Sequence, residues 1–114
     1  MKTLKYEKLD WMRQNLDKKM NWEEAIDYCE SLGNGWRLPT SKELMLITDH
    51  SKANPAIKID AQVKSDWYWS STTYVTNTGF AWVVGLKDGG VSIVYKTSNY
   101  YVWPVRDIAK LEQC

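Results

Sequence analysis

Hydrophobic residues recur at helical spacing in the first half of the chain. From Trp22 to about Leu32 they gather on one helical face, and the acidic residues fall on the other. Asn21 and Glu24 predict a capping box at the start of this helix, and Gly33 predicts its end. The expected buried face holds Trp22, Ala25 or Ile26, Cys29 and Leu32.

A second helical pattern begins soon afterwards. Thr40 and Glu43, again three positions apart, predict another capping box. The helix is expected to run from Ser41 to about Asp49. Its buried positions should be Leu44 and Ile47, with either Met45 or Leu46.

The segment Gly35–Thr40 between these helices is expected to be extended. Pro39 cannot continue a helix and favours an extended backbone at the residue before it. Trp36 and Leu38 alternate with Arg37, so the Trp and Leu side chains should enter a core. Arg37 is then left for a buried or half-buried ion pair, and the segment is interpreted as a structural hinge.

Alternating patterns dominate from Trp67 onwards. Trp67–Thr72 alternates between two faces, and Phe80–Leu86 is apolar on both faces, which is typical of a central strand. Lys87–Gly90 predicts a hairpin turn, with Val91–Tyr95 as the returning strand. Val102–Val105 is expected to close the sheet.

The remaining segments complete a single domain over residues 1–114. Thr3–Tyr6 is expected to be a short strand and Leu9–Met12 a second extended piece or turn. Residues 51–66 read as a polar loop, and the last eight residues as helical or frayed. The expected fold class is α+β, with two helices packed on a small, twisted, mostly antiparallel sheet with long loops.

Composition restricts the classes of partner. The 15 basic and 14 acidic residues leave a formal charge of +1, which disfavours nucleic-acid binding. No apolar run approaches the roughly 20 residues of a membrane span, so no membrane segment is expected. Met1–Asp10 lacks the hydrophobic region of a signal peptide, which favours the cytoplasm of the producing or host cell. A virion or extracellular location is the alternative.

Candidate catalytic and metal-binding residues are sparse. His50 is the only histidine, and its position beside Asp49 favours a role at the helix end over a metal-binding or catalytic role. Ser70, Ser71 and Thr72 are interpreted as a hydrogen-bonding strand end, because no base accompanies them at persuasive spacing. We therefore expect no enzyme activity, no metal and no cofactor.

Aromatic residues supply the candidate binding site. The chain has seven Trp and seven Tyr but one Phe. Trp11, Trp22, Trp36, Trp69 and Trp82 are expected in the core. A Tyr-, Asn- and Ser-rich segment, Tyr95–Tyr101, resembles adaptable binding loops, and an ordinary polar loop is the alternative. The predicted ligand-binding residues are Tyr74, Asn77, Tyr95, Lys96, Ser98, Asn99, Tyr100 and Tyr101.

Several motifs in order carry a family resemblance. They are Leu9-Asp10-Trp11-Met12, Asn21 to Ala25, Tyr28 to Leu32, Gly35 to Leu44, Tyr68 to Thr72, Ala81 to Val84 and Val105-Arg106. In this order they resemble the Lcl C-terminal domain family, a branch of the formylglycine-generating-enzyme-like and C-type-lectin-like folds. The resemblance implies that the two chain ends pair, with Leu4 and Tyr6 near Val102–Val105. It also implies a ligand face on the loops before the last strand.

Cysteine usage departs from what the family implies. The resemblance implies that Cys29 matches one half of a disulfide found in the family, but the position of the partner cysteine is occupied by Pro104 in this chain. Cys29 is therefore expected to be a buried free thiol, with a bridge to Cys114 as the alternative. The pair of active cysteines used by the formylglycine-generating relatives is also absent.

Three functional hypotheses remain open at this level. The first is a small intracellular protein of phage or mobile-element type that binds and inhibits a host protein complex. The second is a glycan- or cell-surface-binding module, such as a phage receptor-binding tip. The third is a structural virion or oligomeric subunit, and the residues leave the oligomeric state open.

Overall fold

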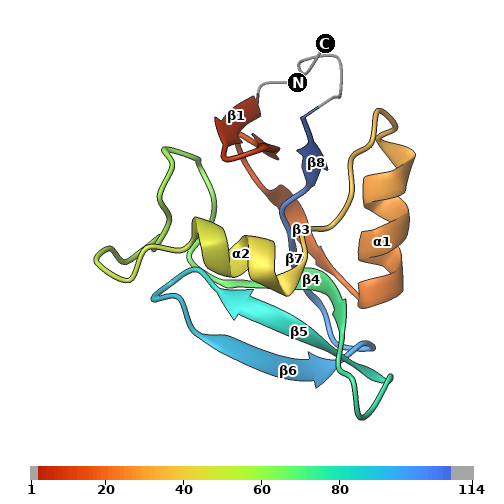
Figure 1. The fold of residues 1–114 in the computed structure, drawn as a ribbon. Helices are drawn as coiled ribbons and strands as arrows, with labels where there is room; N and C mark the ends of the chain where they lie inside the picture. The colour runs from red at the N-terminus through yellow and green to blue at the C-terminus, as the bar shows by residue number, and fades with distance from the viewer. Residues whose placement is uncertain (1–2, 109–114) are drawn as a thin grey trace.

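A three-stranded antiparallel sheet joins the two ends of the chain. The computed structural model describes residues 3–108. The sheet has the order β1-β2-β8 and is formed by β1 (Thr3–Tyr6), β2 (Leu9–Met12) and β8 (Val105–Asp107) (Figure 1). The ends therefore pair as expected, but through β2, which lies between β1 and the C-terminal strand.

A five-stranded sheet forms the centre of the molecule. Its order is β3-β7-β4-β5-β6, and only β4 and β7 run parallel. The strands are β3 (Leu16–Met20), β4 (Trp67–Thr73), β5 (Phe80–Gly85), β6 (Val91–Tyr95) and β7 (Tyr100–Val102). The prediction that Phe80–Leu86 forms an internal strand is confirmed, since β5 has neighbours on both sides.

Two features of the strands differ from the expectation. The segment Val102–Val105 does not form one strand, because the chain leaves the central sheet after Val102 and joins the three-stranded sheet at Val105. The strand Leu16–Met20 was not predicted. Its three consecutive charged residues, all exposed, remove the alternation that would have indicated a strand.

Both helices begin at the predicted capping boxes. In α1 (Trp22–Ser31) the Asn21 side chain and Glu24 cap each other, and in α2 (Ser41–Ile47) Thr40 and Glu43 do the same. Gly33 follows the end of α1 with φ +67°, as predicted.

The second helix is shorter than expected. It ends at Ile47 because the next residue, Thr48, is extended and forms a β-bridge with the buried Ile57. Leu44 and Ile47 are fully buried, as predicted, but Met45 and Leu46 are 43% and 41% exposed. The expectation that one of these two would be buried is wrong.

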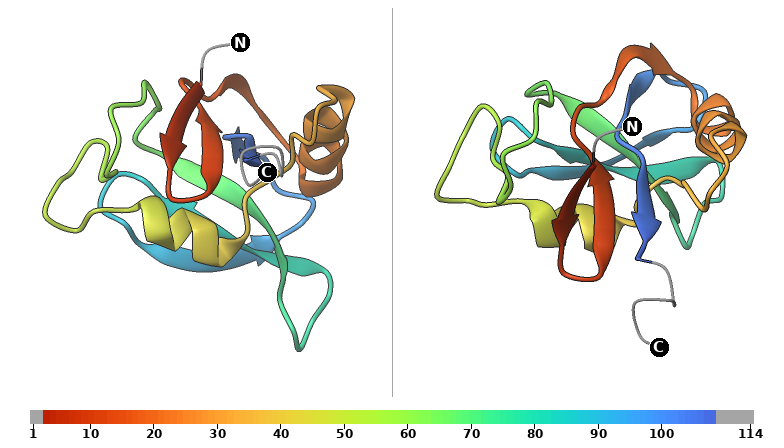
Figure 2. Two further views of the ribbon diagram at one scale, coloured as in Figure 1. Left: turned by 45° about the horizontal axis from the view of Figure 1, so that its top comes forward. Right: turned by 90° about the horizontal axis from the view of Figure 1, so that it is seen from above.

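Two hydrophobic cores lie on opposite faces of β4. Tyr68 and Trp69 are adjacent and fully buried, and a strand directs adjacent side chains to opposite faces. Tyr68 packs with Leu44 and Ile47 of α2, whereas Trp69 packs with the buried side of α1. Figure 2 shows the two helices at different sides of the central sheet.

The expected core tryptophans divide into two groups. Trp11, Trp36 and Trp69 are buried, which confirms their prediction. Trp22 and Trp82 are only partly buried.

The hinge segment forms the predicted ion pair. Arg37 donates two hydrogen bonds of 2.8 Å to the two carboxylate oxygens of Glu43 and one of 3.1 Å to Asp107. The hydrogen bonds to Glu43 raise the pKa of Arg37. Burial alone would raise the pKa of Glu43, but hydrogen bonds from Arg37 and Thr40 outweigh it and hold this pKa below its usual value. Trp36 and Leu38, on either side, are buried as predicted.

The thiol of Cys29 is free and fully buried in α1. Burial raises the pKa of Cys29 to about 12, so the thiol stays protonated and unreactive at neutral pH. Cys114 lies outside the described residues, as do most of the last eight residues, for which a helical or frayed structure was expected.

The polar residues considered for chemistry have structural contacts. Ser70 donates to the carbonyl of Trp82 at 2.7 Å, and Thr72 accepts from the N–H of Ser41 at 2.9 Å, which confirms their hydrogen-bonding role. His50 lies beyond the end of α2, where its Nε2 is 3.3 Å from the carbonyl oxygen of Gly89. Within residues 3–108 no helix is long and apolar enough to cross a membrane.

The burial of α2 leads to a stability prediction. Replacing Leu44, which is fully buried, with Ala should lower the free energy of unfolding by about 2–5 kcal/mol through lost burial and a cavity. Leu46→Ala, on the exposed side of the same helix, should change it by about 0.5 kcal/mol or less. Urea denaturation of both variants measures the difference, and equal losses would contradict the assigned orientation of α2.

Candidate binding face

The hairpin of β5 and β6 brings two aromatic rings together at its open end. The strand register pairs Phe80 with Tyr95 and Trp82 with Ile93. The Phe80 and Tyr95 rings lie 4.4 Å apart between centroids, and the Tyr95 side chain is 62% exposed. An aromatic surface is therefore present where a partner could reach it.

The loop from β4 to β5 extends this surface. The N–H of Tyr74 donates to the carbonyl of Phe80 at 2.9 Å, which fixes the start of the loop. The Tyr74 ring contacts Phe80 at 6.5 Å and Trp82 at 5.7 Å, both edge-on. Val75, at the following position, is 87% exposed. We call Tyr74, Val75, Phe80, Trp82 and Tyr95 the aromatic face.

Asn77 shapes the loop that carries Val75. Its side-chain oxygen accepts from the N–H of Gly79 at 3.0 Å, and its carbonyl accepts from the N–H of Phe80 at 3.1 Å. These bonds form a tight turn. Asn77 is exposed at the rim of the aromatic face.

Lys96 has a structural role that the sequence did not indicate. Its ammonium lies 4.0 Å from the centroid of the Trp22 ring and donates to the hydroxyl of Thr73 at 3.0 Å. Its backbone carbonyl also accepts from the N–H of Trp22. Lys96 therefore connects the end of β6 to α1 and is not free to contact a ligand.

The predicted binding loop is shorter than expected. Tyr100 and Tyr101 lie in β7, between β3 and β4, and not in a loop. The Tyr100 ring packs edge-on against Trp69 at 5.2 Å, and the Tyr101 ring lies 5.8 Å from Tyr68. Both belong to the packed sheet, so their assignment to an exposed loop is wrong.

Ser98 and Asn99 remain in the short turn before β7. Ser98 is partly buried and Asn99 is exposed. The N–H of Ser98 donates to the carbonyl of Tyr95 at 3.0 Å, so the turn folds back on the end of β6. Of the eight predicted site residues, Tyr74, Asn77 and Tyr95 come together at the aromatic face or its rim.

Three residues of the aromatic face were missed from the sequence. Phe80 and Trp82 were assigned to an internal strand, and Val75 was not considered. The strand register could have identified Phe80 from the sequence, because the hairpin turn at Lys87–Gly90 places it opposite Tyr95.

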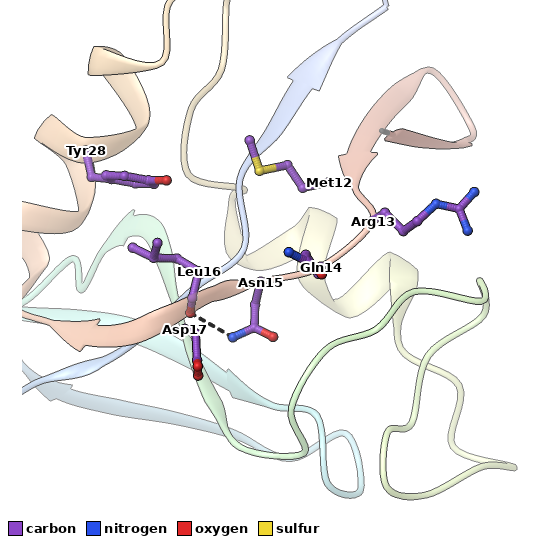
Figure 3. Close-up of a pocket in the computed structure, with 7 residues that line it drawn as sticks. All are labelled: Met12, Arg13, Gln14, Asn15, Leu16, Asp17 and Tyr28. Carbon is purple, nitrogen blue, oxygen red and sulfur yellow. Dashed lines mark hydrogen bonds between the residues drawn. The ribbon is translucent and has the colours of Figure 1, made fainter. Parts of the chain in front are cut away.

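A groove lies between α1 and the segment leading into β3. Its volume is about 460 Å³, within the range of small-ligand sites. Figure 3 shows Tyr28 directed towards Met12 and Leu16, whereas Arg13 points away from them. No pattern in the sequence indicated this groove, whose lining residues are Met12, Arg13, Gln14, Asn15, Leu16, Asp17 and Tyr28.

The chemistry of both surfaces is that of binding. Aromatic rings with polar edges and a flanking amide provide apolar area and hydrogen bonds. Among residues 3–108, no three His, Cys, Asp or Glu side chains are placed to hold a metal ion.

The fold defines a class of proteins. Solved structures with this arrangement include botrocetin, at 14% sequence identity and a TM-score of 0.64, covering 92% of this chain and 95% of botrocetin. A chain in the complex of botrocetin with a mutant von Willebrand factor A1 domain has 12% sequence identity and a TM-score of 0.61, covering 92% of this chain and 95% of that chain. EMS16, an antagonist of a collagen receptor integrin, has 13% sequence identity and a TM-score of 0.61, covering 94% of this chain and 97% of EMS16. The fold is therefore C-type-lectin-like.

Within this class the sequence identifies the family. Residues 5–106 match the Lcl C-terminal domain, and the chain belongs to that family. The resemblance seen in the motifs is confirmed. A comparison with curated protein sequences gives no significant match.

The two groups of tyrosines should respond differently to truncation. Tyr95→Ala removes a mostly exposed ring and should lower the free energy of unfolding by about 1 kcal/mol or less. Tyr100→Ala removes a ring packed on the buried Trp69 and should cost about 2–4 kcal/mol. Chemical denaturation of the two variants tests this, and a larger loss for Tyr95→Ala would place Tyr95 in the core.

Proposed function

We propose that this chain is a non-catalytic binding module that recognises a protein partner through its aromatic face. The observation that carries the proposal is the exposure of Tyr95, whose ring packs with Phe80, together with that of Val75, which follows Tyr74 in the adjoining loop. Rigid aromatic anchors bind at low entropic cost, and Tyr and Trp are enriched among the residues that dominate binding energy.

The construction of the face supports this role. Phe80 and Trp82 are held by β5, and Tyr74 is held by its hydrogen bond to Phe80, so the anchors are ordered before any partner arrives. Order before binding reduces the entropy lost on association. The related fold of botrocetin, solved with a von Willebrand factor domain, gives a precedent for protein recognition on this scaffold.

A more specific form of the proposal concerns the partner. We propose that it is a host protein complex met inside the cell, as for a phage or mobile-element product that inhibits such a complex. The buried free thiol of Cys29 supports a reducing compartment, since Pro104 stands where the family pattern places its partner.

The experiment compares variants of the face with a matched control. Tagged protein is used to capture partners from bacterial lysate under reducing conditions, and affinity for the purified partner is then measured by calorimetry. The variant Val75→Ser with Tyr95→Ala should weaken binding by about 30-fold or more, equal to about 2 kcal/mol. Met45→Ala with Leu46→Ala removes exposed apolar groups from α2 instead and should leave the affinity unchanged.

Two results would contradict the proposal. One is a partner that binds the Val75 and Tyr95 variant normally. The other is a partner that is lost only when the α2 residues are changed, which would place the interface on the helix.

The groove favours glycan binding as a second candidate function. The Tyr28 ring and the Gln14 amide at its wall combine a flat apolar surface with hydrogen-bonding groups. If the chain recognises glycans there, Tyr28→Ala should abolish binding on a glycan array, and Tyr95→Ala should not. Loss with Tyr95→Ala alone would assign glycans to the aromatic face, and no binding by the unaltered chain would exclude this function.

A further inference from the structure

The outer edge of β6 has backbone groups available for pairing. The bonds from Gly85 N–H to the Gly90 carbonyl and from Lys96 N–H to the Gly79 carbonyl, at 2.7 and 2.9 Å, lie at the two ends of the β5–β6 ladder. Hydrogen-bonded pairs alternate along an antiparallel ladder, so the backbone N–H and C=O groups of Ser92 and Val94, which fall in the same register as these bonds, face β5. The backbone N–H and C=O groups of Val91 and Ile93 therefore face outwards, where the Ile93 carbonyl accepts a long hydrogen bond of 3.5 Å from the Ser92 hydroxyl. Within residues 3–108 no strand lies beyond β6.

The two edges of the central sheet differ in protection. Natural edge strands usually carry charges, bulges or proline, which prevent pairing with another chain. At the opposite edge, β3 has three exposed charged residues and an irregular register with β7. Strand β6 has no charged residue or proline, and its five pairs with β5 are uninterrupted. The unprotected edge is therefore the one beside the aromatic face.

We propose that a second copy of this chain pairs with β6 in an antiparallel arrangement, which makes one continuous sheet across a two-fold axis at Ile93. This inference goes beyond the proposed function and does not depend on it. Pairing about Ile93 places Val91 opposite Tyr95 of the second copy, using the outward-facing backbone groups. The side chains of Val91, Ile93 and Tyr95 lie on one face of the strand, so each meets an apolar side chain of the second copy.

The side chains of β6 favour the antiparallel arrangement of two copies. The exposed Val91 and Tyr95 of each copy then cover each other, and β6 itself carries no charge that would oppose the approach. The Lys96 ammonium stays with Thr73 and the Trp22 ring, and Asp88 lies beside Lys87 in the turn before the strand. The two-fold axis also sets the aromatic faces of both copies on the same side of the sheet, where they form one larger surface.

The test uses the position of Ile93 on the axis. Light scattering during gel filtration should give twice the 13.3 kDa mass for the unaltered chain. Ile93→Lys and Ile93→Glu should each raise the dissociation constant of the dimer about tenfold or more, because like charges then face each other. An equal mixture of the two variants should restore the dimer, because Lys faces Glu. Lys18→Glu, at the β3 edge, should leave the dimer intact.

Several outcomes overturn the proposal. They are a single 13.3 kDa species at all concentrations, a dimer unaffected by Ile93→Lys, and variants that weaken the dimer but do not recover when mixed. Recovery on mixing cannot arise from misfolding of either variant, and circular dichroism of each variant verifies the fold. Val75 lies outside β6, so partner binding is measured with Val75→Ser alone, and either proposal can fail without the other.

Discussion

The ion pair of Arg37 and Glu43 determines how the parts of this domain meet. Arg37 binds both carboxylate oxygens of Glu43, and Glu43 also accepts from the N–H of Thr40 at the start of α2. The backbone of Arg37 exchanges two hydrogen bonds with Val105 of β8, at 2.8 and 2.9 Å. One residue thus joins the second helix to the C-terminal strand. A bidentate pair of this kind restricts orientation as well as distance, which a hydrophobic contact alone would not do.

The same segment connects to the binding surface. The carbonyl of Pro39 accepts from the N–H of Ser71 at 2.8 Å, and the N–H of Ser41 donates to Thr72 at 2.9 Å. These bonds hold the end of β4, from which the loop carrying Val75 departs. The base of the aromatic face is therefore attached to the rigid centre of the domain. Such attachment explains how a loop can present apolar residues to solvent in a defined position.

Local patterns predicted the elements well and the topology less well. Both capping boxes and the hairpin turn depend on residues a few positions apart, so their sequence signals are strong. An ion pair of Arg37 was predicted, but its partner Glu43 was not. The strand Leu16–Met20 was missed because its pairing with β7 connects residues about 80 positions apart and its exposed side chains are charged. The early end of α2 has a similar cause, since Ile57 withdraws Thr48 from the helix. Long-range pairing of this kind leaves no periodic trace in the sequence.

Tyrosine content alone could not locate the site, because the same residue type serves both packing and binding. Tyr100 and Tyr101 occupy a strand between β3 and β4, where their rings pack against Trp69 and Tyr68 and are partly buried. Tyr95 lies on an edge strand, so one side of its ring has no neighbouring strand. The difference arises from the crossing of the chain between β6 and β7, which a reading of composition cannot detect. Strand order, more than residue type, therefore separates the aromatic residues that stabilise this domain from those available to a partner.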